Sequence, residues 1–238
     1  MNIYIRQDIP VGIYWNQTDW LITASDWDNM ITIADKNLWA TSTDTSSTDS
    51  YWNVYQRWNN YWVPGSRGTS SWTVNASTYW PNNYYSSSIF RSSSYGSEAY
   101  EWYWDSSYNA DLWWWTTDTY EARKWPCDTW WHIPSESDIA SLNTILTSLS
   151  VSWWLKSLFK MPTPWWNDKN GDRTADTMSV FWTSNSTGNN TWGRFYEYGG
   201  ANFQYYGNFW KSIALSIRPF KNEPVTPTSS RTVLYQPS

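Results

Sequence analysis

Residues 135–149 read SESDIASLNTILTSL, and they carry the strongest structural signal in this chain. Ser135 stands where a helix N-cap is expected, and the carboxylate of Asp138, three positions later, completes a variant of the capping box. Apolar residues then recur at the period of an α-helix. These residues are Ile139, Leu142, Ile145, Leu146 and Leu149. The pattern predicts one main helix that buries its apolar stripe in the core.

Short segments on both sides of this helix have the alternation that is typical of half-buried strands. These segments are residues 31–34, 178–182, 192–198, 203–206 and 213–218. The turn Gly199-Gly200 joins two of them into a predicted hairpin, and the polar stretches 41–50 and 64–97 predict long loops. We therefore expect an α+β fold with one main core helix, short antiparallel strands and long irregular loops.

The composition suggests how the chain is divided. We expect residues 1–30 to form a linker and a first strand, residues 31–222 to form the domain, and residues 223–238 to form a linker or tail rich in Pro, Ser and Thr. The length is sufficient for one large core.

Charge and hydropathy exclude two kinds of partner. The formal net charge is −5, and Lys and Arg form no runs, which argues against binding to nucleic acid through phosphate contacts. No apolar run is long enough to span a membrane, so we expect no membrane insertion. The chain begins without a basic segment followed by an apolar core, so no signal peptide is visible in it. From its Ser, Thr, Asn and Tyr content we still expect an extracellular or cell-surface protein.

The chain has 24 Trp but only 10 Gly. Ordinary glycine usage would give roughly 17 in a chain of this length. Several tryptophans stand in settings such as Trp80-Pro81-Asn82 and Pro164-Trp165, where turns favour glycine. We therefore hypothesise that many of these tryptophans are encoded by UGA codons, which the source bacterium reads as glycine. The alternative is a tryptophan-rich surface that stacks on sugars.

Five motifs, in this order along residues 12–222, resemble the Fibrobacter succinogenes major paralogous domain family. ITIADKNLWAT at residues 31–41 is similar to the family's TIADKNLGAT, and YWNVYQRWNNYW at 51–62 to YGxxYQWGNNYG. LWWWTTDTYEARKWPCDTWWHIPS at 112–135 is similar to LWGxTTxTxEARKGPCPTGWHVPS. The last two motifs, at residues 181–184 and 215–218, resemble YWSS and LSVR. The resemblance implies glycine at Trp39, Trp52, Trp62, Trp114, Trp125 and Trp130, and true tryptophan at Trp113, Trp131, Trp182 and Trp192.

The resemblance implies a C-type-lectin-like fold, related to formylglycine-generating-type domains and to the variable proteins of diversity-generating retroelements. The family usually has a second cysteine after its final Val-Arg, but here Pro219 follows Arg218. Cys127 is the sole cysteine, so the chain cannot form an internal disulfide or supply cysteine metal ligands for formylglycine-generating chemistry.

The segment 185–209 has the composition of an antibody paratope, in which rigid aromatic rings are combined with adaptable polar side chains. We expect it to contact an unknown protein or glycan ligand on a cell surface. The candidate residues are Asn185, Asn189, Asn190, Arg194, Tyr196, Tyr198, Asn202, Phe203, Tyr205, Tyr206, Asn208 and Phe209. The alternative is a twisted hairpin whose aromatic residues pair across the strands.

Oxygen-bearing residues at alternate positions make one weak candidate for a calcium site. They are Asp168, Asn170, Asp172 and Asp176. The glycine of this segment stands at the fourth position rather than the sixth, and the twelfth position carries no Glu, so a plain polar turn is the alternative.

The sequence contains no convincing set of catalytic residues. His132 is the sole histidine, which excludes a histidine pair for zinc and favours a structural role beside the core helix. We therefore predict a non-enzymatic ligand-binding module that has no cofactor, apart from the weak calcium candidate. The alternatives are a retroelement variable protein, an enzyme of the formylglycine-generating-like fold that acts on glycan or protein, and a structural repeat of a larger surface protein.

Overall fold

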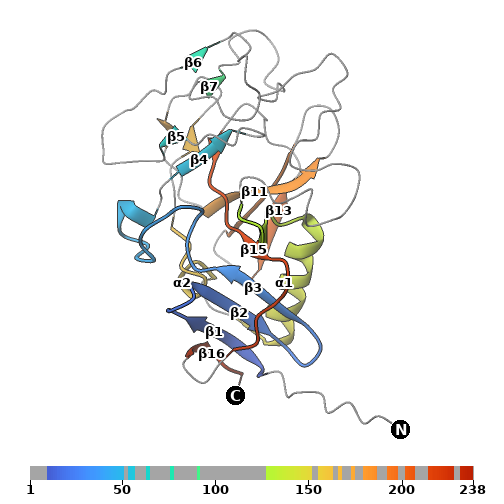
Figure 1. The fold of residues 1–238 in the computed structure, drawn as a ribbon. Coiled ribbons are helices and arrows are strands. Elements are labelled where there is room, and N and C mark those ends of the chain that lie inside the picture. The colour runs from blue at the N-terminus through green and yellow to red at the C-terminus, as the bar shows by residue number, and fades with distance from the viewer. Residues whose placement is uncertain are drawn as a thin grey trace.

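The computed structural model describes several long stretches of the chain (Figure 1). They are residues 10–50, 127–151, 155–162, 214–227 and 231–237. Shorter described stretches cover residues 53–56, 63–64, 76–77, 90–91, 166–167, 173–174, 179–186, 192–197 and 202–206. The account below concerns these residues.

The first sheet begins as a meander of three antiparallel strands, β1 (Gly12–Asn16), β2 (Leu21–Ser25) and β3 (Met30–Ala34). Its order is β16-β1-β2-β3-β15-β8, so segments from near both ends of the chain lie in one sheet. The other three strands are β8 (Trp131–His132), β15 (Phe220–Lys221) and β16 (Thr232–Tyr235).

This sheet differs from the predicted division of the chain. Residues 1–30 were expected to contain a linker and one strand, but β1 and β2 both belong to the sheet, and Ile13 and Ile22 are fully buried. The predicted C-terminal linker contains β16, which pairs with β1. The run Ile13-Tyr14-Trp15 was the available signal for β1, but it is short and does not alternate.

The remaining strands form smaller sheets. A five-stranded sheet has the order β10-β9-β14-β4-β5, a three-stranded sheet the order β11-β12-β13, and β6 and β7 form a parallel pair. Their bounds are β4 Asn53–Gln56, β5 Val63–Pro64, β6 Ala76–Ser77, β7 Phe90–Arg91, β9 Trp166–Asn167, β10 Arg173–Thr174, β11 Ser179–Ser186, β12 Trp192–Glu197, β13 Phe203–Tyr206 and β14 Ala214–Leu215. The predicted hairpin of β12 and β13 is confirmed.

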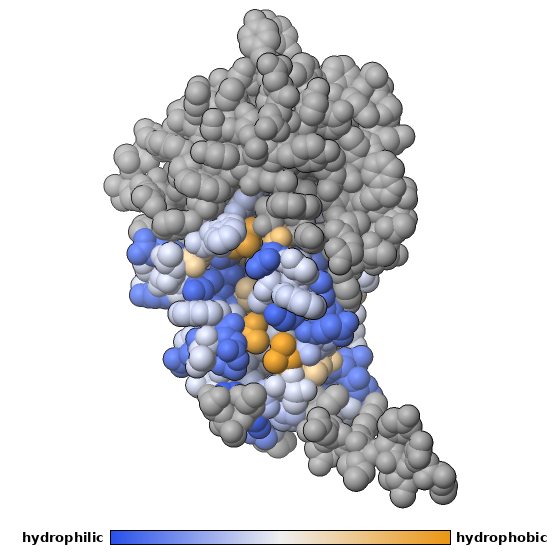
Figure 2. Space-filling view, in the orientation of Figure 1, coloured by the Kyte–Doolittle hydropathy of each residue, from blue (hydrophilic) through white to orange (hydrophobic). Residues whose placement is uncertain are grey.

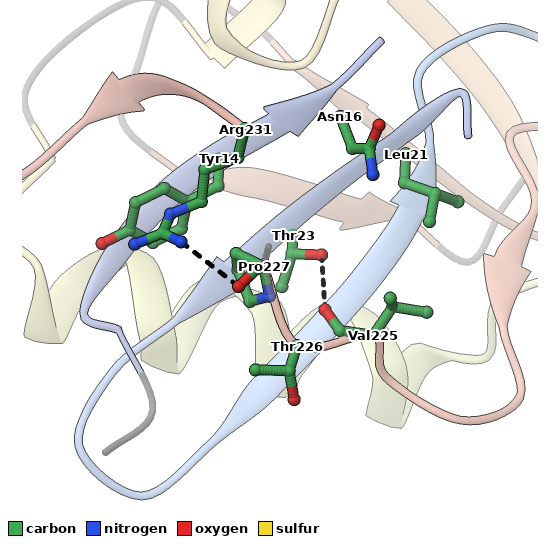
Figure 3. A pocket seen from close by; sticks show the side chains of 8 residues that line it. All are labelled: Tyr14, Asn16, Leu21, Thr23, Val225, Thr226, Pro227 and Arg231. Atoms are coloured by element: carbon green, nitrogen blue, oxygen red, sulfur yellow. Dashed lines mark hydrogen bonds between the residues drawn. The ribbon is translucent and has the colours of Figure 1, made fainter. Parts of the chain in front are cut away.

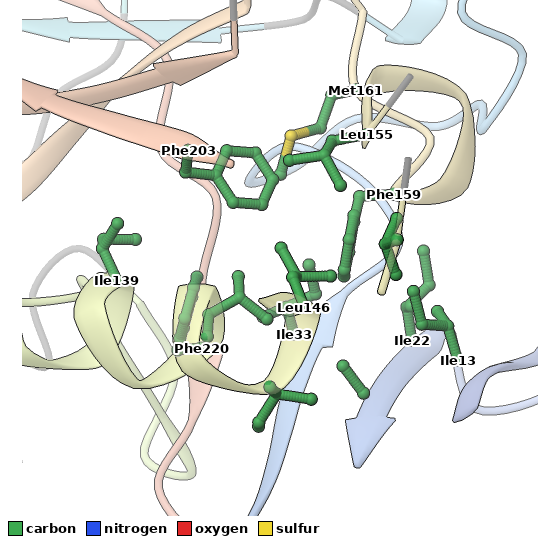
Figure 4. Packing of buried hydrophobic residues seen from close by; sticks show 14 of the residues in the cluster. Ile13, Ile22, Ile33, Ile139, Leu146, Leu155, Phe159, Met161, Phe203 and Phe220 are labelled. Carbon is green, nitrogen blue, oxygen red and sulfur yellow. The ribbon is translucent and has the colours of Figure 1, made fainter. Parts of the chain in front are cut away.

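The predicted core helix is confirmed as α1 (Glu136–Ser148). Ser135 is its N-cap, and the reciprocal bonds of a capping box join Ser135 and Asp138. The apolar stripe of α1 packs against β2 and β3, and the cluster extends to Phe159, Phe203 and Phe220 (Figure 4). A one-turn helix, α2 (Leu155–Leu158), and the 3-10 turn η1 (Thr48–Ser50) complete the described helical elements.

The fold is therefore mixed α and β, with mostly antiparallel strands and few helices. In the described part of the chain, no helix is long and apolar enough to cross a membrane. The described residues on the face shown in Figure 2 are mostly hydrophilic, with a few hydrophobic ones near its centre.

Candidate functional site

The strands β11, β12 and β13 contain six of the twelve predicted ligand-binding residues. They are Asn185 in β11, Arg194 and Tyr196 in β12, and Phe203, Tyr205 and Tyr206 in β13. Asn202 immediately precedes β13 and is exposed. The other five lie outside the described residues: Asn189, Asn190, Tyr198, Asn208 and Phe209.

The strand register divides this sheet into two faces. Tyr196 is the partner of Gln204 and Arg194 is the partner of Tyr206, so these residues belong to one face by the alternation of a strand. Gln204 is exposed, whereas Val180, which pairs with Tyr196 from the other side, is buried. The open part of this face therefore lies at β13.

Phe203 belongs to the opposite face and to the core. It is 2% exposed, and its ring packs edge-on against Phe159 with 5.6 Å between the ring centroids. The inclusion of Phe203 among the ligand-contacting residues is therefore corrected, because its side chain fills the space between β13 and α2. By alternation, Tyr205 shares the face of Phe203.

Helix α1 fixes the outer edge of β13. The side-chain amide of Asn143 donates to the carbonyl oxygen of Phe203 and accepts from its backbone N–H, both at 2.8 Å. Asn143 thus makes the two bonds that a neighbouring strand would make, and it pairs an edge that would otherwise be open. Together with the buried Phe203 ring, these bonds anchor β13 to the core.

The calcium candidates Asp168, Asn170, Asp172 and Asp176 lie outside the described residues. Within the described ranges, no group of three His, Cys, Asp or Glu side chains could hold a metal ion.

His132, Asp138 and Ser135 meet at the start of α1, but their connections differ from those of a hydrolytic triad. The hydroxyl of Ser135 donates to the carboxylate of Asp138 at 2.8 Å, and His132 Nε2 lies 3.3 Å from the same carboxylate oxygen. His132 Nδ1 lies 3.0 Å from the amide oxygen of Asn222. In a triad the serine bonds to the histidine rather than to the acid. This arrangement agrees with the predicted structural role of His132.

Cys127 is buried, and burial raises the pKa of its thiol well above the ordinary value. The neighbouring carboxylate of Asp128 raises the pKa further. A thiol of this kind is neutral at physiological pH, so it is a poor nucleophile.

The sequence did not single out a hollow of about 380 Å³ beside β3. Asp35 and Asn37 line it, and both side chains are at least 98% buried. Trp15 Nε1 donates to Asp35 Oδ2 at 2.8 Å, while Asp35 Oδ1 and both polar atoms of the Asn37 side chain have no partner. Burial raises the pKa of Asp35, and Trp15, Arg218 and Lys36 oppose the rise. In the sequence, the available signal for this hollow was the group of polar residues directly after the apolar run 31–34.

The side chain of Arg218 is fully buried although it carries a positive charge. It donates to the carbonyl oxygens of Ala34 and Lys160, each at 3.0 Å. Burial lowers its pKa to about 9, and the charge of Asp35 opposes the change, so the guanidinium stays charged at neutral pH.

Two tryptophans that line the hollow have backbone angles that favour glycine. Trp20 has φ 61° and Trp39 has φ 65°, and both side chains are more than half exposed. The other non-glycine residues with positive φ in the described part of the chain, Ser150 and Lys160, follow the ends of α1 and α2. Left-handed geometry is common at such helix ends.

No protein-family model, curated protein or solved structure matches this chain.

Proposed function

We propose that this protein is a non-enzymatic module that binds a glycan or protein ligand on a bacterial surface or as a secreted protein. The contact surface would centre on β13, with Asn202, Gln204 and Tyr206, and would continue to Arg194 and Tyr196 of β12. The observation that carries the proposal is the division of one strand, because Gln204 is exposed while its neighbour Phe203 is buried. An anchored strand with exposed polar residues, here Asn202 and Gln204, gives a preorganised binding surface.

The proposed architecture is a C-type-lectin-like domain. It is supported by the resemblance of the five sequence motifs and, in the described part of the chain, by the long helix α1 packed on antiparallel strands. Within this proposal the chain could serve as a retroelement variable protein or as a structural repeat. A neighbouring reverse transcriptase gene with a template repeat would favour the first, and tandem copies would favour the second.

The absence of catalytic activity is also a proposal, and two local environments support it. The thiol of Cys127 is buried and neutral, and His132 is bound to Asn222 and Asp138 beside a helix cap. An enzyme of the formylglycine-generating-like fold would need a reactive group that these two side chains do not provide.

The first test separates binding from stability without requiring a known ligand. On the proposed surface, Tyr206→Ala should leave the melting temperature almost unchanged, because substitutions at a solvent-facing position usually change stability by less than about 0.5 kcal/mol. Phe203→Ala, whose side chain is 2% exposed, should lower the free energy of unfolding by about 3–5 kcal/mol. If Tyr206→Ala unfolds the protein as Phe203→Ala does, the proposed surface is core.

The second test is a glycan array, with Tyr206→Ala and the matched control Glu223→Ala beside the wild type. Glu223 is exposed and lies outside the β11-β12-β13 sheet. We expect a glycan that the wild type and the control bind, and that Tyr206→Ala binds at least tenfold more weakly, since central aromatic residues dominate interface energies. Equal binding by all three proteins would contradict the assigned surface. If the wild type binds no glycan, the ligand is not a glycan of the array and the protein form of the proposal remains.

A further inference from the structure

The segment before β16 crosses the face of the first sheet that lies opposite α1. Ile22 and Ile33 face the core cluster, so Thr23 and Thr32, one position away on each strand, face the other side. Val225 is bonded to Thr23 (Figure 3) and also to Thr32. We name residues 225–227 and 231–235 the strap.

The bonds at Val225 form a closed ring. Its N–H donates to the Thr32 hydroxyl at 2.8 Å, and its carbonyl oxygen accepts from the Thr23 hydroxyl at 3.1 Å. The two hydroxyls lie 2.9 Å apart. Because the Thr23 proton is directed to Val225, Thr32 must donate to Thr23. Every polar group in the ring is thereby satisfied, although both threonines are buried. The two threonines bind the backbone N–H and carbonyl groups of Val225 and not its side chain.

The far end of the strap is held at the edge of β1. β16 pairs with β1 in antiparallel register, and a Cβ atom on Gly12 would lie 2.6 Å from the carbonyl oxygen of Tyr235. Gly12 also has φ 143°, which side chains rarely adopt. The hydroxyl of Tyr235 donates to the carbonyl of Leu149, the C-cap of α1, at 2.9 Å. This edge is shaped for the close approach of another strand.

The middle of the strap makes one further contact with the same face and one bond within itself. The guanidinium of Arg231 lies 4.8 Å from the ring centroid of Tyr14, and Arg231 donates to the carbonyl oxygen of Pro227 at 3.2 Å (Figure 3). In contrast, β16 itself is mostly exposed or half-buried, and Val233 is 51% exposed. The strap is therefore held mainly by backbone contacts, and in β16 the side chains of Leu234 and Tyr235 pack partly against the core cluster.

We propose that the outer face of β1–β3 and the edge of β1 form a strand-receiving surface, and that the strap of a second copy of this chain can occupy it. The strap contains the last described element of the chain, so it can leave the sheet without displacing any other described element. A strap supplied by another copy makes the same contacts, because the Val225 ring, the β1 pairing and the Tyr235 bond all lie between the strap and the rest of the chain. When the strap leaves, the edge of β1 is open, and an open edge is a template for strand addition.

The proposal predicts that the surface binds the strap as a separate peptide. The probe is a fluorescent peptide with the sequence of residues 222–238, and the receiver is the full chain carrying Val233→Pro with Leu234→Pro. Consecutive N–H groups of a strand point to opposite edges, so one of these two prolines removes a donor that faces β1. The receiver should bind the peptide at least about tenfold more tightly than the wild type, whose own strap competes at high effective concentration.

Two matched changes complete this experiment. Gly12→Val in the receiver should abolish peptide binding, because its Cβ meets the backbone of Tyr235. Gln236→Pro, placed after β16, should leave the full chain as resistant to the peptide as the wild type. A folded receiver that does not bind the peptide, or one that binds it equally well with Gly12→Val, would overturn the proposal.

A second measurement tests exchange directly and does not depend on the prolines. Deletion of Glu223 and Pro224, which connect β15 to the strap, shortens this connection by about 7 Å, which exceeds the spacing of two neighbouring strands, about 4.8 Å. The strap of the deletion variant should therefore reach β1 only in another copy, and size-exclusion chromatography should show dimers that an excess of the free peptide converts to monomers. A monomer with the free energy of unfolding of the wild type would refute the exchange.

Discussion

The tryptophans beside β3 and the tryptophan in β11 are the same residue type in opposite environments. Trp20 and Trp39 have left-handed backbone geometry and exposed side chains. Trp182 lies in an extended strand, is fully buried, and donates from its indole nitrogen to the carbonyl oxygen of Tyr55 at 2.7 Å. At the first two positions the indole is mostly exposed, and its one described ring contact is that of Trp20 with Lys36, whereas the fold uses both the volume and the N–H group of Trp182.

This difference supports the hypothesis that the letter W stands for two amino acids in this chain. The sequence motifs implied glycine at Trp39 and true tryptophan at Trp182. The backbone angle of Trp39 and the burial of Trp182 fit that division, and they come from geometry that was not used to make it. The motifs did not indicate whether position 20 is glycine or tryptophan. Its φ of 61° is similar to that of Trp39, so we group it with the positions that favour glycine.

The largest expected effect is that of Trp182→Gly. Loss of a buried Trp side chain costs about 3–5 kcal/mol, and glycine within a strand adds about 0.5–1 kcal/mol. Urea denaturation should therefore show a fall of roughly 4–6 kcal/mol in the free energy of unfolding, or an unfolded protein. The comparison fails if the fall is under about 1 kcal/mol, because Trp182 would then be no more structural than the exposed tryptophans.

The contrast also explains what the sequence could predict. The period of α1, its cap at Ser135 and the β12–β13 hairpin are local patterns, and the structure confirms all three. The pairing of β16 with β1 joins residues at opposite ends of the chain, and no local pattern specifies it. Phe203 was assigned to the binding surface because composition does not say which face of a strand a residue occupies. The register with β12 and the packing on Phe159 settle that question.

Trp15 stands between the two groups, since it is half-buried and bonded to a buried acid. Trp15→Phe removes the indole donor of Asp35, and the loss should lower the free energy of unfolding by about 1–3 kcal/mol near pH 7. Burial already raises the pKa of Asp35, and the bond from Trp15 opposes that rise, so the variant should raise the pKa further.

The direction of the pH dependence follows from linkage. A carboxyl group whose pKa is raised by folding favours the folded state in acid, and this contribution is lost as the pH rises through the folded-state pKa. The destabilisation by Trp15→Phe should therefore be largest near neutral pH and shrink as the pH falls through the raised folded-state pKa values of Asp35, which lie above the ordinary Asp value of 3.8. Denaturation curves across this range provide the measurement. In an Asp35→Asn background the dependence should vanish, and a deficit that stays constant with pH would show that Asp35 is not involved.

Replacement of Trp39 and Trp20 by glycine should stabilise the protein. A left-handed conformation costs a residue with a side chain about 1–2 kcal/mol, and glycine avoids this cost. The gain at Trp20 should be the smaller one, because the ammonium of Lys36 lies 3.3 Å from the centroid of its ring, a contact worth about 0.5–1 kcal/mol at an exposed site. Trp27 is the matched control. It is 75% exposed and its φ is not positive, so Trp27→Gly should not stabilise. Equal changes in the free energy of unfolding at all three positions would contradict the explanation by backbone geometry.

Trp130 should give the smallest effect on stability, and it links the folding measurements to the chemical identity of the residue. It is 66% exposed in a turn, without positive φ, so Trp130→Gly should change the free energy of unfolding by less than about 0.5 kcal/mol. Stability therefore cannot identify the residue at position 130, and peptide mass spectrometry of the protein from its natural source must do so. We expect glycine at positions 39, 52, 125 and 130, and also at position 20, with tryptophan at 131 and 182. Tryptophan at all four motif positions would reject the recoding. Glycine at position 182 would contradict the division of the tryptophans into two groups, because the fold would then have to fill the volume of a buried indole with other atoms.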